Sequence, residues 1–167
     1  MQGLIAAGAP QMIVWLLDQD RASTLVLAGM RDGVARWRAA DNVQIYTRDG
    51  MIIGTRGMAF DLMTIDADQA VPVITSGMTG QITRIHRQLD GQDRLKITSY
   101  VCDIVPAGSE TIRTGETSYA STLRVDEQCY SPSGDLENRY WLHDGQILQS
   151  EQIFNRDVGR IRILFLH

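Results

Sequence analysis

The chain has 167 residues, of which 44% are hydrophobic and 22% charged, with a formal net charge of -4 and an isoelectric point near 5.3. This length suits one domain with a core of its own, so we expect a single domain over residues 1–167. Nucleic acid is not an expected partner, because phosphate binding needs a basic surface and the 16 Lys and Arg residues are scattered among 20 acids.

The N-terminal segment is apolar from Leu4 to Leu17, although Pro10 and Gln11 interrupt it. It is shorter than the roughly 20 residues that a membrane helix needs, so we expect no membrane-spanning helix. No Lys or Arg precedes Arg21, and the segment therefore lacks the basic region of a secretory signal. The residues alone leave two interpretations open: a cytosolic protein, or an exported protein without its leader.

The dominant hydrophobic period along the chain is two, which is typical of β-strands. In QITRIHRQLD at 81–90, for example, Ile82, Arg84, His86 and Gln88 share one face of the predicted strand. Strands are predicted near 11–19, 22–31, 34–38, 42–47, 50–55, 81–89, 94–104, 109–114, 117–129, 137–143, 146–154 and 158–166.

The connections between these strands are predicted to be short, because four Asp-Gly pairs and four prolines fall between the runs. Asp-Gly tolerates the positive φ angles of tight hairpin turns. Only MAFDLMTID at 58–66 suggests a short helix, and the weakly patterned segment 66–80 is predicted to be a long loop. We therefore predict a mainly all-β fold, an antiparallel meander with one or two short helices. The turns are predicted at Asp32-Gly33, Asp49-Gly50, Asp90-Gly91 and Asp144-Gly145.

The segment 138–152, NRYWLHDGQILQSEQ, is predicted to be one of these hairpins. Its apolar side chains occur on both faces, so we expect neighbouring elements to cover both. Aromatic rings and amides are also what a sugar-binding surface uses, and this second role stays open beside the architectural one. The predicted register pairs His143 with Gln146, Leu142 with Ile147, Trp141 with Leu148 and Tyr140 with Gln149, with Tyr140, Leu142 and Ile147 on one face.

The sequence contains no recognisable catalytic or metal-binding motif. HExxH, paired CxxC and EF-hand spacings are absent, and His86 and His143 fall in different predicted hairpins. Neither a GxSxG elbow nor a phosphate-binding glycine loop occurs. We expect no metal, no cofactor and no enzymatic activity.

Two pairs of acids resemble in type the carboxyl pairs of glycoside hydrolases. Asp126 and Glu127 are adjacent on a predicted strand and point to opposite faces, so they cannot converge on one substrate. Glu137 and Glu151 lie across the predicted hairpin. They keep a polysaccharide-processing enzyme open as an alternative, although ordinary surface acids explain them equally well.

The two cysteines, Cys102 and Cys129, both lie in alternating, β-like sequence. Adjacent strands would bring their Cβ atoms within bonding range. A disulfide would close a loop of about 27 residues and contribute on the order of 3 to 4 kcal/mol. Two separate buried thiols explain the same residues equally well, so the pairing stays open at this point.

Two motifs in this order resemble those of the YjbF/GfcB family of group 4 capsule and exopolysaccharide lipoproteins. RDGMIIGTRGMAFDLM at 48–63 is similar to the family signature dG...T.Gl..DL, and 138–152 is similar to N.YW.d..G.i..S.Q. SYVCDIV and VDEQCY resemble paired-cysteine segments of some members, and GAPQMIVWLLD resembles their first strand. The matching positions are Gly50, Thr55, Gly57, Asp61, Leu62, Asn138, Tyr140, Trp141, Gly145, Ser150 and Gln152.

The resemblance implies a strongly curved antiparallel sheet or half-barrel, in an outer-membrane lipoprotein that faces the periplasm. In that oxidising compartment it implies a disulfide between Cys102 and Cys129. Family members usually begin with a signal and a lipid-modified cysteine, neither of which this sequence contains. The resemblance therefore implies attachment to the outer membrane through an N-terminal lipid outside residues 1–167.

The resemblance also implies a non-enzymatic accessory role in exopolysaccharide or capsule production or export. The implied partners are secretion proteins or the polysaccharide itself. We expect contacts with a glycan or a partner at Arg56, Tyr140, Trp141, Gln149 and Gln152. An alternative is a periplasmic carrier of lipids or lipoproteins, which would hold its cargo in a hydrophobic concavity.

Overall fold

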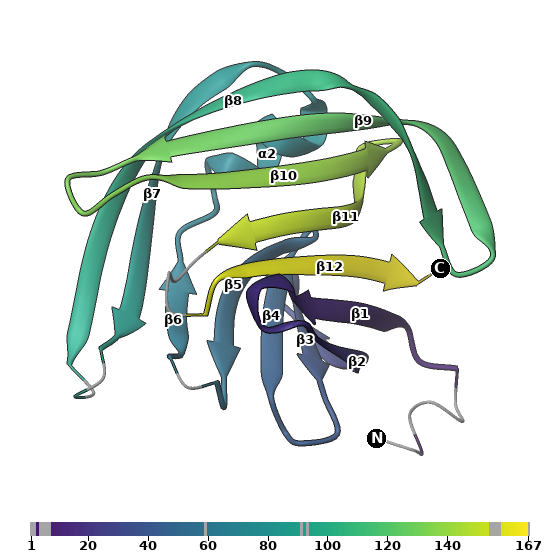
Figure 1. Cartoon of the computed structure of the whole chain (residues 1–167), viewed down its shortest axis with the longest axis horizontal. Helices are drawn as coiled ribbons and strands as arrows, with labels where there is room; N and C mark the ends of the chain where they lie inside the picture. The colour runs from purple at the N-terminus through teal and green to yellow at the C-terminus, as the bar shows by residue number, and fades with distance from the viewer. Residues whose placement is uncertain are drawn as a thin grey trace.

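The structure is a computed structural model that describes residues 8–58, 60–90, 92, 94–153 and 158–166, together with Gly3. Within these residues, twelve strands form one antiparallel sheet in the order β5-β4-β3-β2-β1-β12-β11-β10-β9-β8-β7-β6. The sheet rolls up until its edge strands, β5 and β6, face each other, and it is nearly closed into a barrel (Figure 1). The predicted mainly β meander with a strongly curved sheet is confirmed.

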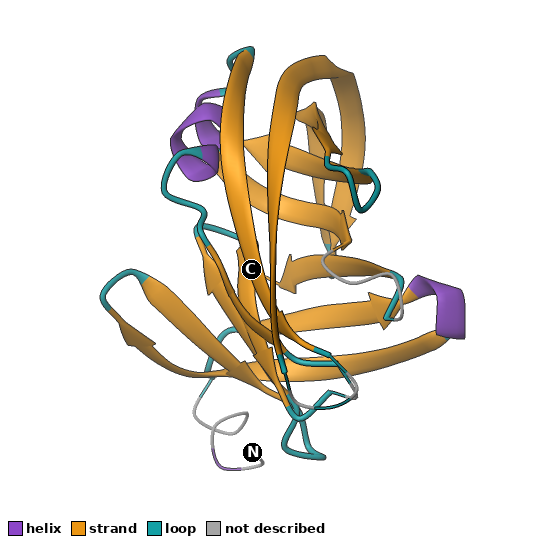
Figure 2. Ribbon diagram, turned by 90° about the vertical axis from the view of Figure 1, so that its left-hand side faces the viewer, coloured by secondary structure: helices purple, strands orange, loops and turns teal. Residues whose placement is uncertain are grey.

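The strands and helices have well-defined bounds in the described chain. Figure 2 shows strands over most of the molecule and two short helices at separate positions, α2 and the 3-10 helix η1. The elements are β1 Gln11–Leu16, η1 Leu17–Gln19, β2 Arg21–Arg31, β3 Val34–Arg38, β4 Gln44–Arg48, β5 Met51–Arg56, β6 Leu62–Ile65, α2 Ala70–Ser76, β7 Gly80–Leu89, β8 Leu95–Thr114, β9 Thr117–Tyr130, β10 Leu136–His143, β11 Gln146–Ile153 and β12 Arg160–Leu166.

The helix predicted over 58–66 is wrong, because this segment contains the edge strand β6. Leu62 and Ile65 are both buried, and their spacing of three imitates a helical period. A register shift between Leu62 and Thr64 puts both apolar residues on the inner side of a strand that pairs with β7. The long loop predicted over 66–80 is also wrong, since it contains α2, which buries Ala70 and Ile74.

The two strands predicted over 94–104 and 109–114 are a single long strand, β8. Pro106 therefore lies within a strand and not between two, at the start of a register shift that extends to Ser109. A bulge tolerates proline there because it interrupts the ladder of backbone hydrogen bonds. In Figure 1, β8 arches across the top of the molecule together with β9. The far end of this hairpin reaches back over β11 and β12.

Tight hairpin turns form at the predicted Asp-Gly pairs in the described chain. Asp32, Asp49 and Asp144 have φ angles of 51°, 46° and 48°, and the glycine after each of them also has a positive φ angle. The pair at Asp90 includes Gly91, which lies outside the described residues. At Gly50 a Cβ atom would lie 2.7 Å from the Cβ atom of Ile147, so this glycine also allows β11 to approach the turn closely.

A disulfide joins Cys102 on β8 to Cys129 on β9. The two residues are directly opposite each other, with Cα atoms 3.9 Å apart, and both are buried in the main core. The pairing implied by the family resemblance is therefore present in the structure. It locks the register of the two longest strands. Among the described residues, no helix is both long and apolar enough to cross a membrane.

Loss of the disulfide should lower the free energy of unfolding by about 3 kcal/mol, because a loop of 27 residues regains freedom in the unfolded chain. Urea denaturation with and without dithiothreitol measures this change. The Cys102→Ala/Cys129→Ala double variant is the control and should not respond to the reductant. An unchanged denaturation midpoint in wild-type protein, after thiol titration has shown full reduction, would contradict the prediction.

Candidate functional site

A cluster of polar side chains lies inside the rolled sheet, around the carboxylate of Glu127. We call it the Glu127 cluster; its members are Arg84, Glu127, Asn138 and Tyr140. Glu127 Oε2 accepts hydrogen bonds from Arg84 Nη1 at 2.6 Å, Asn138 Nδ2 at 2.7 Å and the Tyr140 hydroxyl at 2.9 Å. All four side chains are 1% exposed or less. The cluster links β7, β9 and β10 without contact with solvent.

The period of two explains why these polar groups point inward. On β7, Ile82, Arg84 and His86 follow one another at a spacing of two and all three are buried. The predicted common face of these residues is therefore confirmed. On β9, Glu127 lies two residues before Cys129 and shares its inner face. The importance of Arg84 and Glu127 was not predicted, although their positions in the alternating pattern contain the signal. Buried charges need a partner, and here each is the other's partner.

The surroundings of the Glu127 cluster shift the pKa values of its members. Burial alone would lower the pKa of Arg84, but the Glu127 carboxylate and its hydrogen bonds outweigh burial, so the pKa is raised and the guanidinium stays charged. Burial raises the pKa of Tyr140 well above 10.0, and the nearby charge of Glu127 adds to the increase. The cluster is thus an ion pair that a neutral phenol supports.

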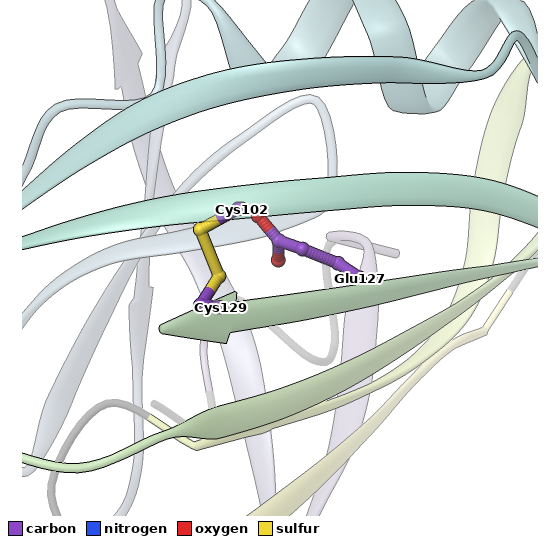
Figure 3. Close-up of side chains that lie close together, drawn as sticks. All are labelled: Cys102, Glu127 and Cys129. Carbon is purple, nitrogen blue, oxygen red and sulfur yellow. A yellow bond between two sulfur atoms is a disulfide. The ribbon is translucent and has the colours of Figure 1, made fainter. Parts of the chain in front are cut away.

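Glu127 also lies beside the disulfide, as Figure 3 shows. Ligand atoms of Cys102, Glu127 and Cys129 lie within 4.8 Å of one another, a separation that suits a metal ion. The sulfurs are joined to each other, however, and a disulfide offers no thiolate as a ligand. Arg84 already balances the charge of Glu127. This group therefore does not fit a metal, and its role is structural.

A second set of hydrogen bonds joins the edge strands β5 and β6, and we call this junction the seam. The Thr55 hydroxyl donates to Asp61 Oδ1 at 3.0 Å and accepts from the Leu62 N–H at 2.9 Å. Asp61 also accepts from the N–H groups of Gly57 and Met58 at 2.9 and 3.1 Å. Four positions of the first family motif therefore join the two edge strands, between which the described residues form no regular strand ladder.

The polar positions of the second family motif bind the ends of neighbouring strands. Asn138 Oδ1 accepts from the Ile153 N–H at 2.8 Å, and Gln152 Nε2 donates to the Ser150 hydroxyl at 2.9 Å. Gln152 Oε1 reaches across the interior and accepts from the Ile52 N–H at 3.1 Å. These bonds link β10, β11 and β5. The motif is therefore explained by the barrel itself.

Trp141 is buried on the outer side of the sheet, beneath the far end of the β8–β9 hairpin. It packs with Ile112 and Leu164, and its indole N–H donates to Glu110 Oε2 at 2.8 Å. Arg124 Nη1 donates to the other oxygen of Glu110 at 2.7 Å. The indole hydrogen bond, followed by Arg124, lowers the pKa of Glu110. The predicted cover on both faces of β10 and β11 is confirmed.

The predicted register of the β10–β11 hairpin is right next to the turn and wrong beyond it. Leu142 pairs with Ile147 as predicted. A bulge then pairs Trp141 with Gln149, and not with the predicted partner Leu148. A bulge adds one unpaired residue, which a hydrophobic pattern does not reveal. The predicted faces are right, since Leu142 and Ile147 join Tyr140 in the main core and Trp141 lies outside it.

The structure separates the five residues predicted to contact a glycan or a partner. Tyr140, Trp141 and Gln152 are buried, and each makes the structural hydrogen bonds described above. Gln149 and Arg56 are half-buried. Arg56 donates to the Leu62 carbonyl at 3.1 Å and so contributes to the seam. A role in binding stays a prediction for all five, and only Gln149 and Arg56 offer accessible surface for it.

The acids Glu137 and Glu151 lie in a network of ion pairs on the outer face. Arg139 contacts Glu137 at 2.5 Å, and Arg162 contacts Glu151 at 2.6 Å. Arg160 lies within 3.7 and 3.8 Å of the two carboxylates. Arginines thus neutralise Glu137 and Glu151, the two acids whose type resembles the carboxyl pair of a glycoside hydrolase. This arrangement is typical of a structural network.

Five of the eight large apolar side chains that are exposed in the described chain lie on the outer face of β8 and its neighbour β9. Leu95, Ile97, Val101, Val105 and Tyr130 are between 44% and 58% exposed, and we call this set the β8 face. Val101 is directly opposite Tyr130 in the ladder. Ser99 and Asp103 lie among these apolar residues on the same side of β8. Exposed apolar side chains grouped in this way are a feature of interaction surfaces. It is the candidate functional site on the outside of the molecule.

Replacement of Tyr140 by Phe should lower the free energy of unfolding by about 2 kcal/mol at neutral pH, because a hydrogen bond to a buried carboxylate is lost. The raised pKa of Tyr140 stabilises the fold below about pH 10, the unfolded value, and this contribution is lost as the pH rises toward the folded value. The stability of Tyr140→Phe should therefore fall less steeply above pH 10 than that of wild type.

Urea denaturation at neutral and alkaline pH measures both effects of this substitution. Tyr130→Phe is the matched control, since Tyr130 is an exposed tyrosine on the neighbouring strand β9. It should match wild type at every pH. Equal alkaline slopes for wild type and Tyr140→Phe would contradict the role of the buried phenol.

Comparison with known proteins agrees with the geometry. The family model described as group 4 capsule polysaccharide lipoprotein gfcB, YjbF matches residues 2–166. The uncharacterized lipoprotein YjbF of Escherichia coli (strain K12) is 26% identical over 154 residues, which are 90% of this chain and 66% of that protein, slightly less than two thirds.

The fold is similar to the crystal structure of the hypothetical lipoprotein YmcC from Escherichia coli (K12). The TM-score is 0.83 with 17% identity, over 99% of this chain and 87% of the other. At this identity the similarity shows the fold alone. Because the family model matches nearly the whole chain, this protein belongs to the YjbF/GfcB family of group 4 capsule polysaccharide lipoproteins, membrane-anchored proteins of the bacterial envelope.

Proposed function

We propose that this protein is a non-enzymatic accessory lipoprotein of capsule or exopolysaccharide production or export, and that it binds a protein of the secretion machinery through the β8 face. The family supplies the setting, since its description names a capsule polysaccharide lipoprotein. The observation that supports the mode of action is the exposed apolar strip on β8, which the fold itself does not need.

The chemistry of the β8 face suits a protein better than a glycan. Four of its five side chains are aliphatic, and Tyr130 is its single aromatic ring. Sugars are usually held by aromatic rings together with several polar groups that fix their hydroxyls. The polar side chains of β8 among them are Ser99 and Asp103, and Asp103 already accepts a hydrogen bond from Gln81 at 2.8 Å. Aliphatic side chains with a few polar neighbours are typical of protein contacts, which bury an apolar centre inside a polar rim.

The absence of enzymatic activity is part of the proposal. Asp126 and Glu127 lie on opposite faces of β9, and Glu127 is the buried centre of an ion pair. Glu137 and Glu151 are held by arginines. In the described chain, the acids considered for glycan cleavage are thus engaged in structural contacts.

We also propose that the full protein acts at the periplasmic face of the outer membrane, where a lipid at its N-terminus holds it. The disulfide between Cys102 and Cys129 supports an oxidising compartment. A tethered protein meets its partners at a raised effective concentration, so a modest apolar strip is sufficient for a functional contact.

Complementation of a strain that lacks this protein tests the proposal. The Val101→Asp/Val105→Asp double variant places two charges on the β8 face and should weaken partner binding roughly tenfold or more. Exported polysaccharide per cell should fall toward the level of the deletion strain. The matched control is Met30→Asp/Met78→Asp, which changes two side chains that are 63% and 65% exposed elsewhere. It should restore export.

Immunoblots must show equal amounts of each variant. Full export with the β8 double variant would contradict the proposal. Calorimetric titration of the purified protein with the exported polysaccharide is the second arm, and it should give no heat of binding. Saturable heat that the double variant abolishes would assign the face to the glycan and refute the protein partner.

A further inference from the structure

A cavity opens at the end of the rolled sheet that lies opposite α2. The β3–β4 turn and the β5–β6 loop border it, and both lie at the lower end of the molecule in Figure 1. Its volume is about 430 Å³, within the range of small-molecule sites. We call it the mouth cavity. Its apolar wall includes Val14, Leu16, Leu25, Val43, Ile45 and Phe60.

The wall of the mouth cavity is continuous with the main core. Val14, Leu25 and Ile45 are buried members of that core, and Leu16, Val43 and Phe60 pack against it. The part of the wall on strands β1, β2 and β4 is therefore apolar and preformed, since these strands hold it in place. A chain of methylene groups is the ligand that such a wall favours, because it gains contact area and needs no hydrogen bonds.

The polar groups of the mouth cavity lie near its rim. Gln19 donates its amide to the Val158 carbonyl, and Asp41 Oδ1 accepts from the Val43 N–H at 3.2 Å. Arg21 also lines the cavity, on the same face of β2 as Ser23 and Leu25. Within the described part of the chain, Arg21 has neither an ion pair nor a side-chain hydrogen bond. It is a cation available to a ligand.

We propose that the mouth cavity binds a single-chain amphiphile with an anionic head. The acyl chain lies along Val14, Leu25 and Ile45, and the carboxylate or phosphate head pairs with Arg21. A guanidinium binds either head through two parallel hydrogen bonds. This inference goes beyond the proposed accessory role and does not depend on it, because the cavity and the β8 face share no residue.

Calorimetric titration of the delipidated protein tests this site with three probes: dodecanoate, dodecyl phosphate and neutral dodecanol. Dodecanoate and dodecyl phosphate should each bind once per chain, and dodecanol should bind at least about tenfold more weakly, because it lacks the charge that pairs with Arg21. The tighter of the two anions identifies the preferred head group, a carboxylate or a phosphate.

Two pairs of variants locate the site on strand β2. Ser23→Trp fills the cavity from an exposed position and should lower the affinity for both anions at least tenfold. Thr24→Trp places the same ring on the opposite face and should leave the affinity unchanged. Arg21→Glu should lower the affinity for both anions and leave the affinity for dodecanol unchanged. Arg31→Glu reverses a charge at the far end of β2 and is its control.

Thermal unfolding must show that all four variants are folded. Failure of every probe to bind wild-type protein would overturn the proposal. Equal affinity of Ser23→Trp and Thr24→Trp for the anions would show that the ligand does not bind in the mouth cavity. Equal affinity for dodecanol and dodecanoate would overturn the role of Arg21. None of these results bears on polysaccharide export, so the two proposals fail separately.

Discussion

The structure depends on one buried carboxylate. Glu127 receives three hydrogen bonds inside the rolled sheet, from Arg84 on β7 and from Asn138 and Tyr140 on β10. The disulfide beside it joins β8 to β9. These contacts fix the relative register of four consecutive strands in the region where the sheet bends over the molecule. A buried ion pair adds little net stability, but loss of one member leaves an uncompensated charge, so only the register that keeps the pair together is tolerated.

The family motifs acquire a physical meaning from this arrangement. Thr55, Asp61 and Leu62 close the seam between β5 and β6, and Asn138 and Gln152 satisfy backbone groups at strand ends. Such residues look like a binding site in the sequence, because they are polar, clustered and of mixed type. In the structure their polar atoms are used by the fold. The contacts with other molecules that we propose involve the β8 face, which lies outside both motifs, and the mouth cavity, which Gly57, Met58 and Phe60 of the first motif help to line.

Strand positions and tight turns were predictable because they depend on local alternation and on Asp-Gly pairs, and the disulfide because of the family resemblance. Sequence reasoning failed where one residue shifts a pattern. The bulge after Leu62 made β6 resemble a helix, and the bulge beyond Leu142 changed the partner of Trp141. The burial of Trp141 depends on the β8–β9 hairpin folding back over the sheet, a long-range contact that no local pattern encodes. Arg84 and Glu127 were visible as inward positions, but their pairing needed the register of three strands.

A double-mutant cycle between Arg84 and Glu127 tests the central claim most directly. The variants Arg84→Met, Glu127→Leu and the combination are compared by urea denaturation. Each single variant should lose about 3 to 5 kcal/mol of unfolding free energy, because it leaves a buried charge without its partner. The double variant should lose far less than the sum, with a coupling energy of at least about 2 kcal/mol. If the losses of the two single variants sum to the loss of the double variant within about 0.5 kcal/mol, the claim that each buried charge depends on the other is contradicted.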